Sequence, residues 1–333
     1  MIACLVAYIS VVLGLSVPQG VNSEDRPDIL IVLVDDLGCV DLGSEGHLRH
    51  RTPHADQLRS ESLRFTNAYC NGPNCAPSRA ALMTGKFGSR TGIHTVGSAR
   101  RGKEIDRKVN PPANRTTLRD EEISLAEMMN AAGYQTGYVG KWHLGEDPLD
   151  QGFNVNVGGG KAGHPKSYFP PYKNAQLSDG PEGEFLVDRL ALETAKLINQ
   201  LSMKSPNTQE ADSDRDPWCV VWAPYAVHTP IQAPEKAVAE IRAQHPKITP
   251  RQARYMALVE AMDRGLGTVL DSVDPERTVV IFMSDNGGLN GITDSSPWRG
   301  GKGMMYEGGI RTPLYVRGPG ISPGDIEEPV LIF

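Results

Sequence analysis

The segment Asp28–Val34 (DILIVLV) is followed directly by Asp35-Asp36, and this stretch decides the fold class. A short, nearly uninterrupted apolar run predicts a strand buried on both faces, as in parallel sheets. A second run of the same kind, Thr278–Ser284 (TVVIFMS), is followed by Asp285-Asn286-Gly287-Gly288. Two such strands, far apart in one chain, favour an α/β protein built on a parallel sheet.

Between these strands the chain alternates helical and extended patterns. This alternation predicts a three-layer α/β/α sandwich with a large, mainly parallel central sheet. One helix is expected to start at Thr249-Pro250, a typical N-cap and first helical position. Further helices are expected at Pro53–Ser60, Ser124–Ala132 (stopped by Gly133) and Glu184–Leu201, and further strands at Leu63–Tyr69, Tyr134–Val139 and Trp218–Trp222.

The charge balance restricts the class of partner. The 333 residues include 34 Lys and Arg against 40 Asp and Glu, a net charge of −6. A general nucleic-acid binder would normally be basic, so we expect no nucleic-acid partner. An anionic small substrate stays open, because an acidic protein can contain a locally basic pocket.

The two ends of the chain carry unusual apolar stretches. Ile2–Ser16 has no charged residue; it is too short for a stable membrane span and is typical of a signal peptide. With small residues at Val21–Ser23, residues 1–23 are predicted to be a signal peptide and the protein to be exported, periplasmic or secreted; a buried N-terminal strand is the alternative. The final run Pro329–Phe333 indicates a chain that lacks a C-terminal portion.

Acidic side chains follow both predicted central strands. In open α/β sheets ligands bind beyond the carboxyl ends of the strands, and the adjacent carboxylates of Asp35 and Asp36 repel each other unless a cation neutralises them. Asp285 and Asn286 repeat the arrangement. Oxygen donors without a nearby Cys or His pair favour Ca²⁺ or Mg²⁺ over Zn²⁺. Solvated turns or helix caps are the alternative for each pair.

Cys75 begins a segment, CAPSR, that predicts a helix starting near this cysteine. A helix N-terminus favours an anionic atom or ligand. The alternative is a buried structural thiol. The chain has five cysteines and no CxxC pair, so a disulfide scaffold is not expected.

Several motifs then resemble one family. Cys75–Gly85 (CAPSRAALMTG) is similar to the first signature of the type I, formylglycine-dependent sulfatases of the alkaline phosphatase superfamily. Gly133–His143 (GYQTGYVGKWH) is similar to the second. Supporting matches, in the family's order from about Arg26 to about Gly320, are PDILIVLVDDLG near the start, Ala226–Pro230 (AVHTP), SDNGG at Ser284–Gly288 and Arg299–Leu314 (RGGKGMMYEGGIRTPL).

This resemblance implies a cofactor and a modified residue. Cys75 is expected to be oxidised to formylglycine by a formylglycine-generating enzyme, and the aldehyde hydrate supplies the nucleophile. The metal ligands are expected to be Asp35, Asp36, Asp285 and Asn286, with the modified Cys75 as a further ligand. The ion is expected to be Ca²⁺, with Mg²⁺ as the alternative.

The resemblance also implies catalytic roles. Arg79, Lys141 and Lys302 are expected to bind the hydrate and the sulfate oxygens, because fixed donors stabilise charge that develops in the transition state. His143 is expected to act as the base in the elimination step, and His228 to protonate or polarise the leaving oxygen. Taken singly, both histidines could be structural and Lys302 a solvated lysine. His164 stands where many relatives carry a serine that reaches the sulfate.

The implied activity is that of a sulfuric ester hydrolase with an alkaline phosphatase-like fold. It would convert a sulfated carbohydrate or aryl sulfate ester to alcohol and inorganic sulfate. Residues 24–333 would form the catalytic domain, with most of the smaller C-terminal subdomain absent. The alternatives are a phosphodiesterase or phosphonate hydrolase of the same superfamily, and a truncated, non-catalytic binder of sulfated glycans.

Overall fold

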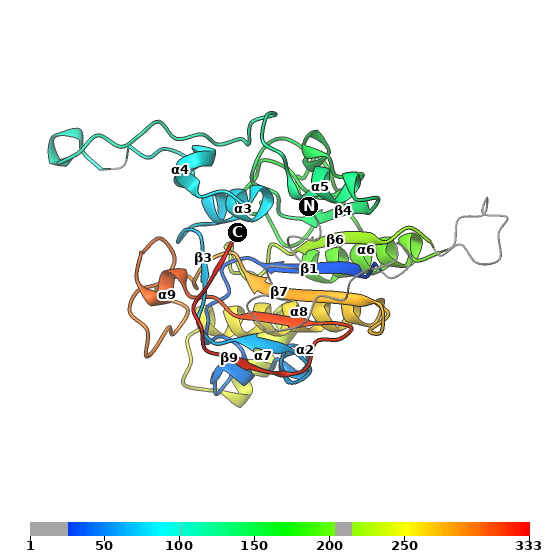
Figure 1. The fold of residues 1–333 in the computed structure, drawn as a ribbon. Helices are drawn as coiled ribbons and strands as arrows, with labels where there is room; N and C mark the ends of the chain where they lie inside the picture. The colour runs from blue at the N-terminus through cyan, green and yellow to red at the C-terminus, as the bar shows by residue number, and fades with distance from the viewer. Residues whose placement is uncertain (1–25, 101, 204–214) are drawn as a thin grey trace.

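The computed structural model describes residues 26–100, 102–203 and 215–333. Within them, one large sheet has the strand order β5-β4-β6-β1-β7-β8-β2-β9 (Figure 1). Neighbouring strands are parallel except where β8 runs antiparallel to β7 and to β2. The predicted α/β class with a mainly parallel central sheet is confirmed.

The bounds of the elements are as follows. The large sheet contains β1 (Asp28–Val34), β2 (Leu63–Phe65), β4 (Gln135–Gly140), β5 (Val155–Val157), β6 (Trp218–Ala223), β7 (Thr278–Ser284), β8 (Leu314–Arg317) and β9 (Gly324–Ile326), and a small second sheet pairs β3 (Ala68–Cys70) with β10 (Val330–Ile332). The helices are α2 (Pro53–Ser60), α3 (Cys75–Thr84), α4 (Gly88–Thr91), α5 (Leu125–Ala131), α6 (Leu186–Leu201), α7 (Glu235–Gln244), α8 (Pro250–Leu270) and α9 (Glu307–Ile310), with short 3₁₀ turns at Gly43–Glu45, Glu104–Asp106 and Pro148–Gln151.

Two hydrophobic cores lie on opposite faces of the sheet. Side chains alternate along β1, so that Leu30 and Val32 pack in one core with residues of α6 and α8. Ile31 and Leu33 enter the other core, which contains residues of α3 and α5. Figure 1 shows α3, α4 and α5 on one side of the sheet and α2, α7 and α8 on the other. This is the predicted three-layer arrangement.

Local sequence signals explain where the main helices begin and end. Thr249 and Gln252 form a capping box at the start of α8, with Pro250 at the first position. Ser124 and Glu127 form a second capping box on α5. Gly133 follows α5 with a φ of +78°, the left-handed conformation expected of a residue that ends a helix.

One predicted strand is wrong. Leu63–Tyr69 was expected to be continuous, but the chain turns at Thr66-Asn67 between β2 and β3. The Thr66 N–H donates to the carbonyl of Ile326, the last residue of β9, and the guanidinium of Arg311 binds the Thr66 carbonyl. The two halves therefore join different sheets, because partners distant in sequence satisfy each half separately.

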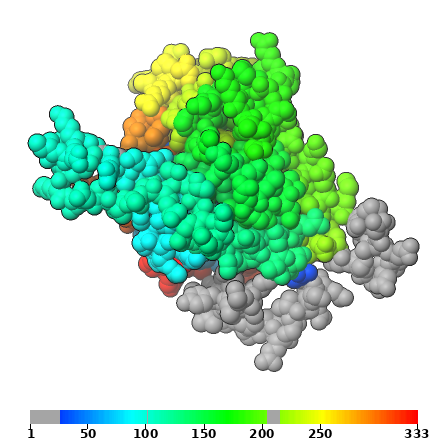
Figure 2. Space-filling view, turned by 90° about the horizontal axis from the view of Figure 1, so that it is seen from above, coloured from blue at the N-terminus to red at the C-terminus, as the bar shows by residue number. Residues whose placement is uncertain are grey.

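The described residues contain no helix with the length and apolar character needed to cross a membrane. The predicted signal peptide, residues 1–23, lies outside the described residues. Figure 2 shows that the blue-green part of the chain, around residue 105, projects from one side of the body.

Candidate active site

The carboxyl ends of three adjacent strands meet at one edge of the sheet. β1 and β7 are parallel and in register, with Val34 opposite Ser284, so Asp35 and Asp285 follow side by side. The Asp285 N–H donates to the Val34 carbonyl at 3.0 Å. The Asp35 N–H donates at 3.1 Å to the carbonyl of Ala226, in the loop after β6. Parallel pairing thus gathers loops that are far apart in the chain.

Hydrogen bonds connect the acidic groups of the two loops. Asp36 has a φ of +61°, and its backbone N–H donates to Asp285 Oδ1 at 3.2 Å. Asn286 Nδ2 donates to Asp36 Oδ1 at 2.8 Å. The amide oxygen of Asn286 is buried and has no hydrogen-bond partner. A buried oxygen without a partner is costly unless a ligand uses it.

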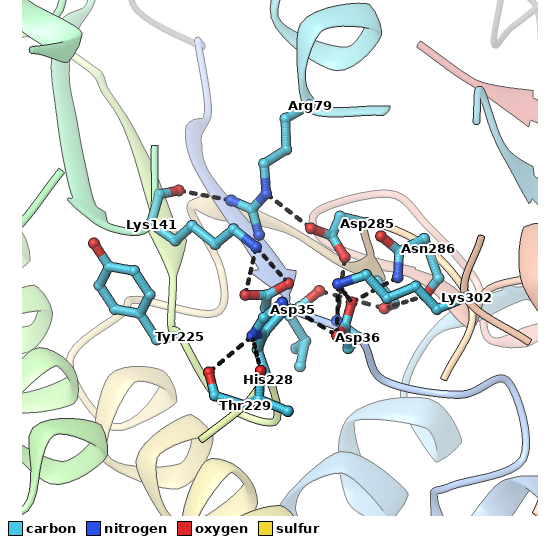
Figure 3. Close-up of polar contacts among 12 residues, drawn as sticks. Asp35, Asp36, Arg79, Lys141, Tyr225, His228, Thr229, Asp285, Asn286 and Lys302 are labelled. Carbon is cyan, nitrogen blue, oxygen red and sulfur yellow. Dashed lines mark hydrogen bonds and ion pairs between the residues drawn. The ribbon is translucent and has the colours of Figure 1, made fainter. Parts of the chain in front are cut away.

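Two lysines neutralise the carboxylates that follow β1 (Figure 3). Lys141, at the end of β4, is fully buried and places its Nζ 2.8 and 2.7 Å from the two carboxylate oxygens of Asp35. Lys302 Nζ lies 2.8 Å from Asp36 Oδ2. Both lysines were predicted from the sequence as site residues, and both reach the predicted edge of the sheet.

Helix α3 brings Cys75 and Arg79 to the same place. The ligand atoms of Cys75, Asp35, Asp36 and His228 all lie within 4.8 Å of one another. Arg79 is buried; its Nε donates to Asp285 Oδ2 at 2.8 Å, and another guanidinium nitrogen donates to the carbonyl of Lys141 at 2.6 Å. Its remaining nitrogen is buried without a partner. Arg79 therefore ties α3 to β4 and β7.

The two predicted histidines differ in their electrostatic environment. Burial, together with Lys141 and Arg79, lowers the pKa of His143 to about 3, and its buried Nδ1 has no hydrogen-bond partner. Burial opposes protonation of His228 as well, but Asp35 and a hydrogen bond with Cys75 raise its pKa. A neutral imidazole suits a base, and a protonated one suits an acid.

The pKa values of two acidic residues and of the cysteine are also shifted from their ordinary values. Burial raises the pKa of Asp35, although Lys141 opposes the shift. Burial would raise the pKa of Asp285 too, but Arg79 and Lys141 hold it below its ordinary value. For Cys75, Lys141 and the hydrogen bond with His228 outweigh burial and lower the pKa to about 7. Such a thiol is partly ionised near neutrality, which makes it reactive toward oxidation.

The donor set fits a hard divalent cation. Asp35, Asp36 and Asp285 supply carboxylate oxygens, and Asn286 supplies the unpartnered amide oxygen. Calcium and magnesium prefer oxygen ligands of this kind. Lys141 and Lys302 lie against the same carboxylates, so the site favours positive charge at this position. These four residues could hold such an ion, with Cys75 close to Asp35 and Asp36.

Sequence reasoning missed the tyrosines that support the site. The Tyr138 hydroxyl donates to the Lys141 carbonyl at 2.6 Å, next to the carbonyl contact of Arg79. The Tyr168 hydroxyl lies 2.6 Å from the carbonyl of Tyr225 and 2.9 Å from that of His228. Tyr138 stands inside the second signature, but nothing in its spacing indicates these contacts. Buried tyrosines usually find a hydrogen-bond partner. This general tendency was the only signal in the sequence for these contacts.

A second group of side chains, Asp41, His47 and His50, lies close together beside the site. His47 Nδ1 accepts the backbone N–H groups of Arg49 and His50 at 3.3 and 2.9 Å, so its proton is on Nε2 and neither nitrogen is free to bind a metal. Asp41 Oδ2 instead accepts from Gly38 N at 2.8 Å and from the Tyr255 hydroxyl at 2.6 Å. This group is a structural network that holds the loop after β1.

Asp41 makes the stability of the protein depend on pH. Burial raises its pKa from 3.8 to about 7, so the folded state binds a proton that the unfolded state releases. The stabilisation is complete below about pH 4 and is lost as the pH rises through about 7. Replacing Asp41 with Asn removes this dependence. We expect the wild type to lose about 3 kcal/mol relative to Asp41→Asn between pH 5 and pH 8. Urea unfolding of both proteins at the two pH values measures the difference, and parallel pH profiles would contradict the assignment.

The chain is similar to sulfatases in both sequence and fold. The sulfatase family model matches residues 27–330. The chain is 30% identical to human N-acetylgalactosamine-6-sulfatase, over 92% of this chain and 60% of that protein. It is 31% identical to human arylsulfatase A, over 94% of this chain and 63% of that protein. The chain thus spans less than two thirds of the length of these relatives.

A solved structure has the same fold. The structure of Ps i-CgsB in complex with k-i-k-neocarrahexaose aligns with a TM-score of 0.74 and 27% identity, covering 92% of this chain and 69% of that one. The similarity therefore extends over most of the chain and not over the motifs alone. The chain belongs to the sulfatase family, within the alkaline phosphatase-like superfamily.

Proposed function

We propose that this protein hydrolyses sulfate esters of carbohydrates, releasing an alcohol and inorganic sulfate. The observation that carries the proposal is the convergence of Cys75, Asp35, Asp36 and His228 within 4.8 Å, bordered by two buried or half-buried lysines. Sulfated sugars are favoured as substrates because relatives are named for a sulfated amino sugar and a solved relative carries a carrageenan-type oligosaccharide.

Cys75 would be converted to formylglycine by a formylglycine-generating enzyme. The hydrated aldehyde would supply one hydroxyl that attacks sulfur and a second whose deprotonation expels sulfate. This proposal is supported by the Cys75 sulfur, which lies within 4.8 Å of the ligand atoms of Asp35, Asp36 and His228. A divalent cation, Ca²⁺ or Mg²⁺, would lower the pKa of the nucleophile and screen the sulfate oxygens.

The chain's own side chains would manage charge and protons. Lys141 and Lys302 would contact the sulfate oxygens, and Arg79 would present its unpartnered guanidinium nitrogen to the modified residue. His228 Nδ1 lies 2.8 Å from the Thr229 carbonyl, which orients the ring so that Nε2 faces the site and can give a proton to the leaving oxygen. His143, held neutral, would take the proton in the elimination step.

The test is sulfate release compared with phosphate release. We expect turnover of 4-nitrophenyl sulfate, and of sulfated monosaccharides in a panel, well above that of 4-nitrophenyl phosphate. Mass spectrometry of the Cys75 peptide should show the mass difference between a thiol and an aldehyde. A preference for the phosphate ester would favour a phosphate or phosphonate hydrolase. Binding of sulfated sugars without turnover, with an intact thiol, would favour a non-catalytic binder.

We further propose that residues 24–333 act as the catalytic domain and that the protein is exported, with residues 1–23 as its signal peptide. The sequence pattern of Ile2–Ser16 supports the second proposal.

A further inference from the structure

The segment Gly163–Lys166 begins with two residues that pack against the candidate catalytic imidazoles, Gly163 on His143 and His164 on His228. A Cβ atom on Gly163 would come within 2.5–2.9 Å of three His143 ring atoms, so the backbone here packs directly on that ring. The next residue, His164, stacks on His228 with ring centroids 5.9 Å apart and an interplanar angle of 11°. His164 therefore extends the site outward from the residue that would protonate the leaving oxygen.

The fold fixes this segment in place. Pro165 is buried, and Tyr168, fully buried, places its hydroxyl between the carbonyls of Tyr225 and His228. The Tyr168 N–H also donates to Gln232 Oε1 at 2.9 Å. These contacts connect the segment to the loop that carries His228. The position of His164 relative to His228 is thus set before any substrate arrives, which lowers the entropy cost of binding.

The exposed side chains of this segment can donate hydrogen bonds to an anion. Lys166 donates through its ammonium group and His164 through a ring N–H, because burial and the neighbouring His228 and Lys166 lower the pKa of His164 and favour its neutral form. His164 and Lys166 are both exposed, and within the described ranges neither makes an ion pair with a carboxylate. Lys161, nearby in the sequence, is different because its Nζ pairs with Glu146 at 2.9 Å. The carboxylates of Asp35 and Asp36 are paired with Lys141 and Lys302, so they do not offset the charge at the rim.

We propose that His164 and Lys166 form an outer anion subsite. It binds a second negatively charged group, a carboxylate or another sulfate, on the alcohol that carries the scissile ester. The inference rests on the proposed function, which places the leaving oxygen at His228. A ligand with one sulfate contacts Lys141 and Lys302 only. It leaves the N–H donors of His164 and Lys166 exposed to water. A polyanionic sugar satisfies both sets, and charge-assisted hydrogen bonds of this kind favour it.

The test compares a monoanionic and a dianionic ester. Kinetics are measured for 4-nitrophenyl sulfate and for 3-carboxy-4-nitrophenyl sulfate with the wild type and with the single variants Lys166→Gln and His164→Asn. We expect each variant to raise the KM for the carboxylated ester about tenfold, with a much smaller change for the other ester. The wild-type preference for the carboxylated ester should also fall as salt is added.

The matched control is Lys161→Gln, which removes a paired, exposed lysine of the same region and should leave both KM values unchanged. Equal KM increases for the two esters in both variants would overturn the subsite while leaving the sulfatase proposal intact. Absence of all turnover would contradict the sulfatase proposal instead. In that case calorimetric titration with phenyl sulfate and 3-carboxyphenyl sulfate decides: tighter binding of the dianion supports the subsite, and equal binding overturns it.

Discussion

Replacing Cys75 with alanine is expected to lower kcat for sulfate esters by about 10⁴-fold or more, because the side chain that would supply the nucleophile is removed. The loss should come without a comparable loss of stability. Cys75 lies at the first position of α3, and alanine is well tolerated in a helix. The measurement is steady-state release of 4-nitrophenol together with thermal unfolding of the variant.

Cys75→Ser tests whether repeated turnover needs the aldehyde in addition to a nucleophilic oxygen. A serine hydroxyl can attack sulfur, but it has no second hydroxyl with which to expel sulfate, so at most one turnover per molecule is expected. Cys219→Ala is the matched control. Burial raises the pKa of this β6 thiol to about 12, so it stays protonated and unreactive. Continued steady-state turnover by Cys75→Ser, or inactivation by Cys219→Ala, would contradict the assignment of the nucleophile.

The second large effect is expected at the buried pair of Arg79 and Asp285. Their side chains are 1% and 0% exposed, and Nε lies 2.8 Å from Oδ2. Arg79→Met leaves the buried Asp285 carboxylate without its hydrogen-bonded cation, and Asp285→Asn leaves the buried guanidinium without its carboxylate. Each single change should therefore lower the free energy of unfolding by about 3–5 kcal/mol. Both should also abolish activity, since Arg79 contacts the site and Asp285 is a candidate metal ligand.

The double variant of Arg79 and Asp285 identifies the cause of the lost stability. If the cost comes from leaving one charge buried, Arg79→Met combined with Asp285→Asn should cost much less than the sum of the single changes. Urea unfolding in the presence of EDTA keeps a bound cation from adding to the difference. The exposed pair Arg264–Asp188, at 2.7 Å, is the control, and Arg264→Met should cost at most about 1 kcal/mol. Additive costs at the buried pair would refute the explanation.

The strongest local patterns predicted their elements well. β1, β7 and α2 have the predicted bounds, and α8 begins at the predicted proline. Each of these segments carries a local signal: a continuous apolar run in β1 and β7, a proline at the first position of α2, and a capping box in α8. Leu63–Tyr69 failed for the opposite reason. Its two halves are stabilised by Ile326 and Arg311, which lie hundreds of residues away in the chain. No local sequence pattern predicts such partners.

The residues of the site also fall into two groups, those that local patterns predicted and those that they did not. The types of its residues, and their places after Val34 and Ser284, were evident from the motifs, since ligands of open α/β sheets bind beyond the carboxyl ends of the strands. The supporting contacts were not evident. Tyr138 and Tyr168 act through hydrogen bonds to carbonyl groups, and any buried tyrosine looks the same in a sequence.

The amino-acid sequence by itself determined the α/β class, the family resemblance and the acidic, basic and sulfur-bearing side chains available for chemistry. Only the tertiary structure decided which charges face one another. The parallel register of β1 with β7 sets Asp35 beside Asp285, and loops from β4 and β6 bring Lys141 and His228 to them. The reason is physical: hydrogen bonding between strands acts across the whole chain, whereas propensity and periodicity act over a few residues.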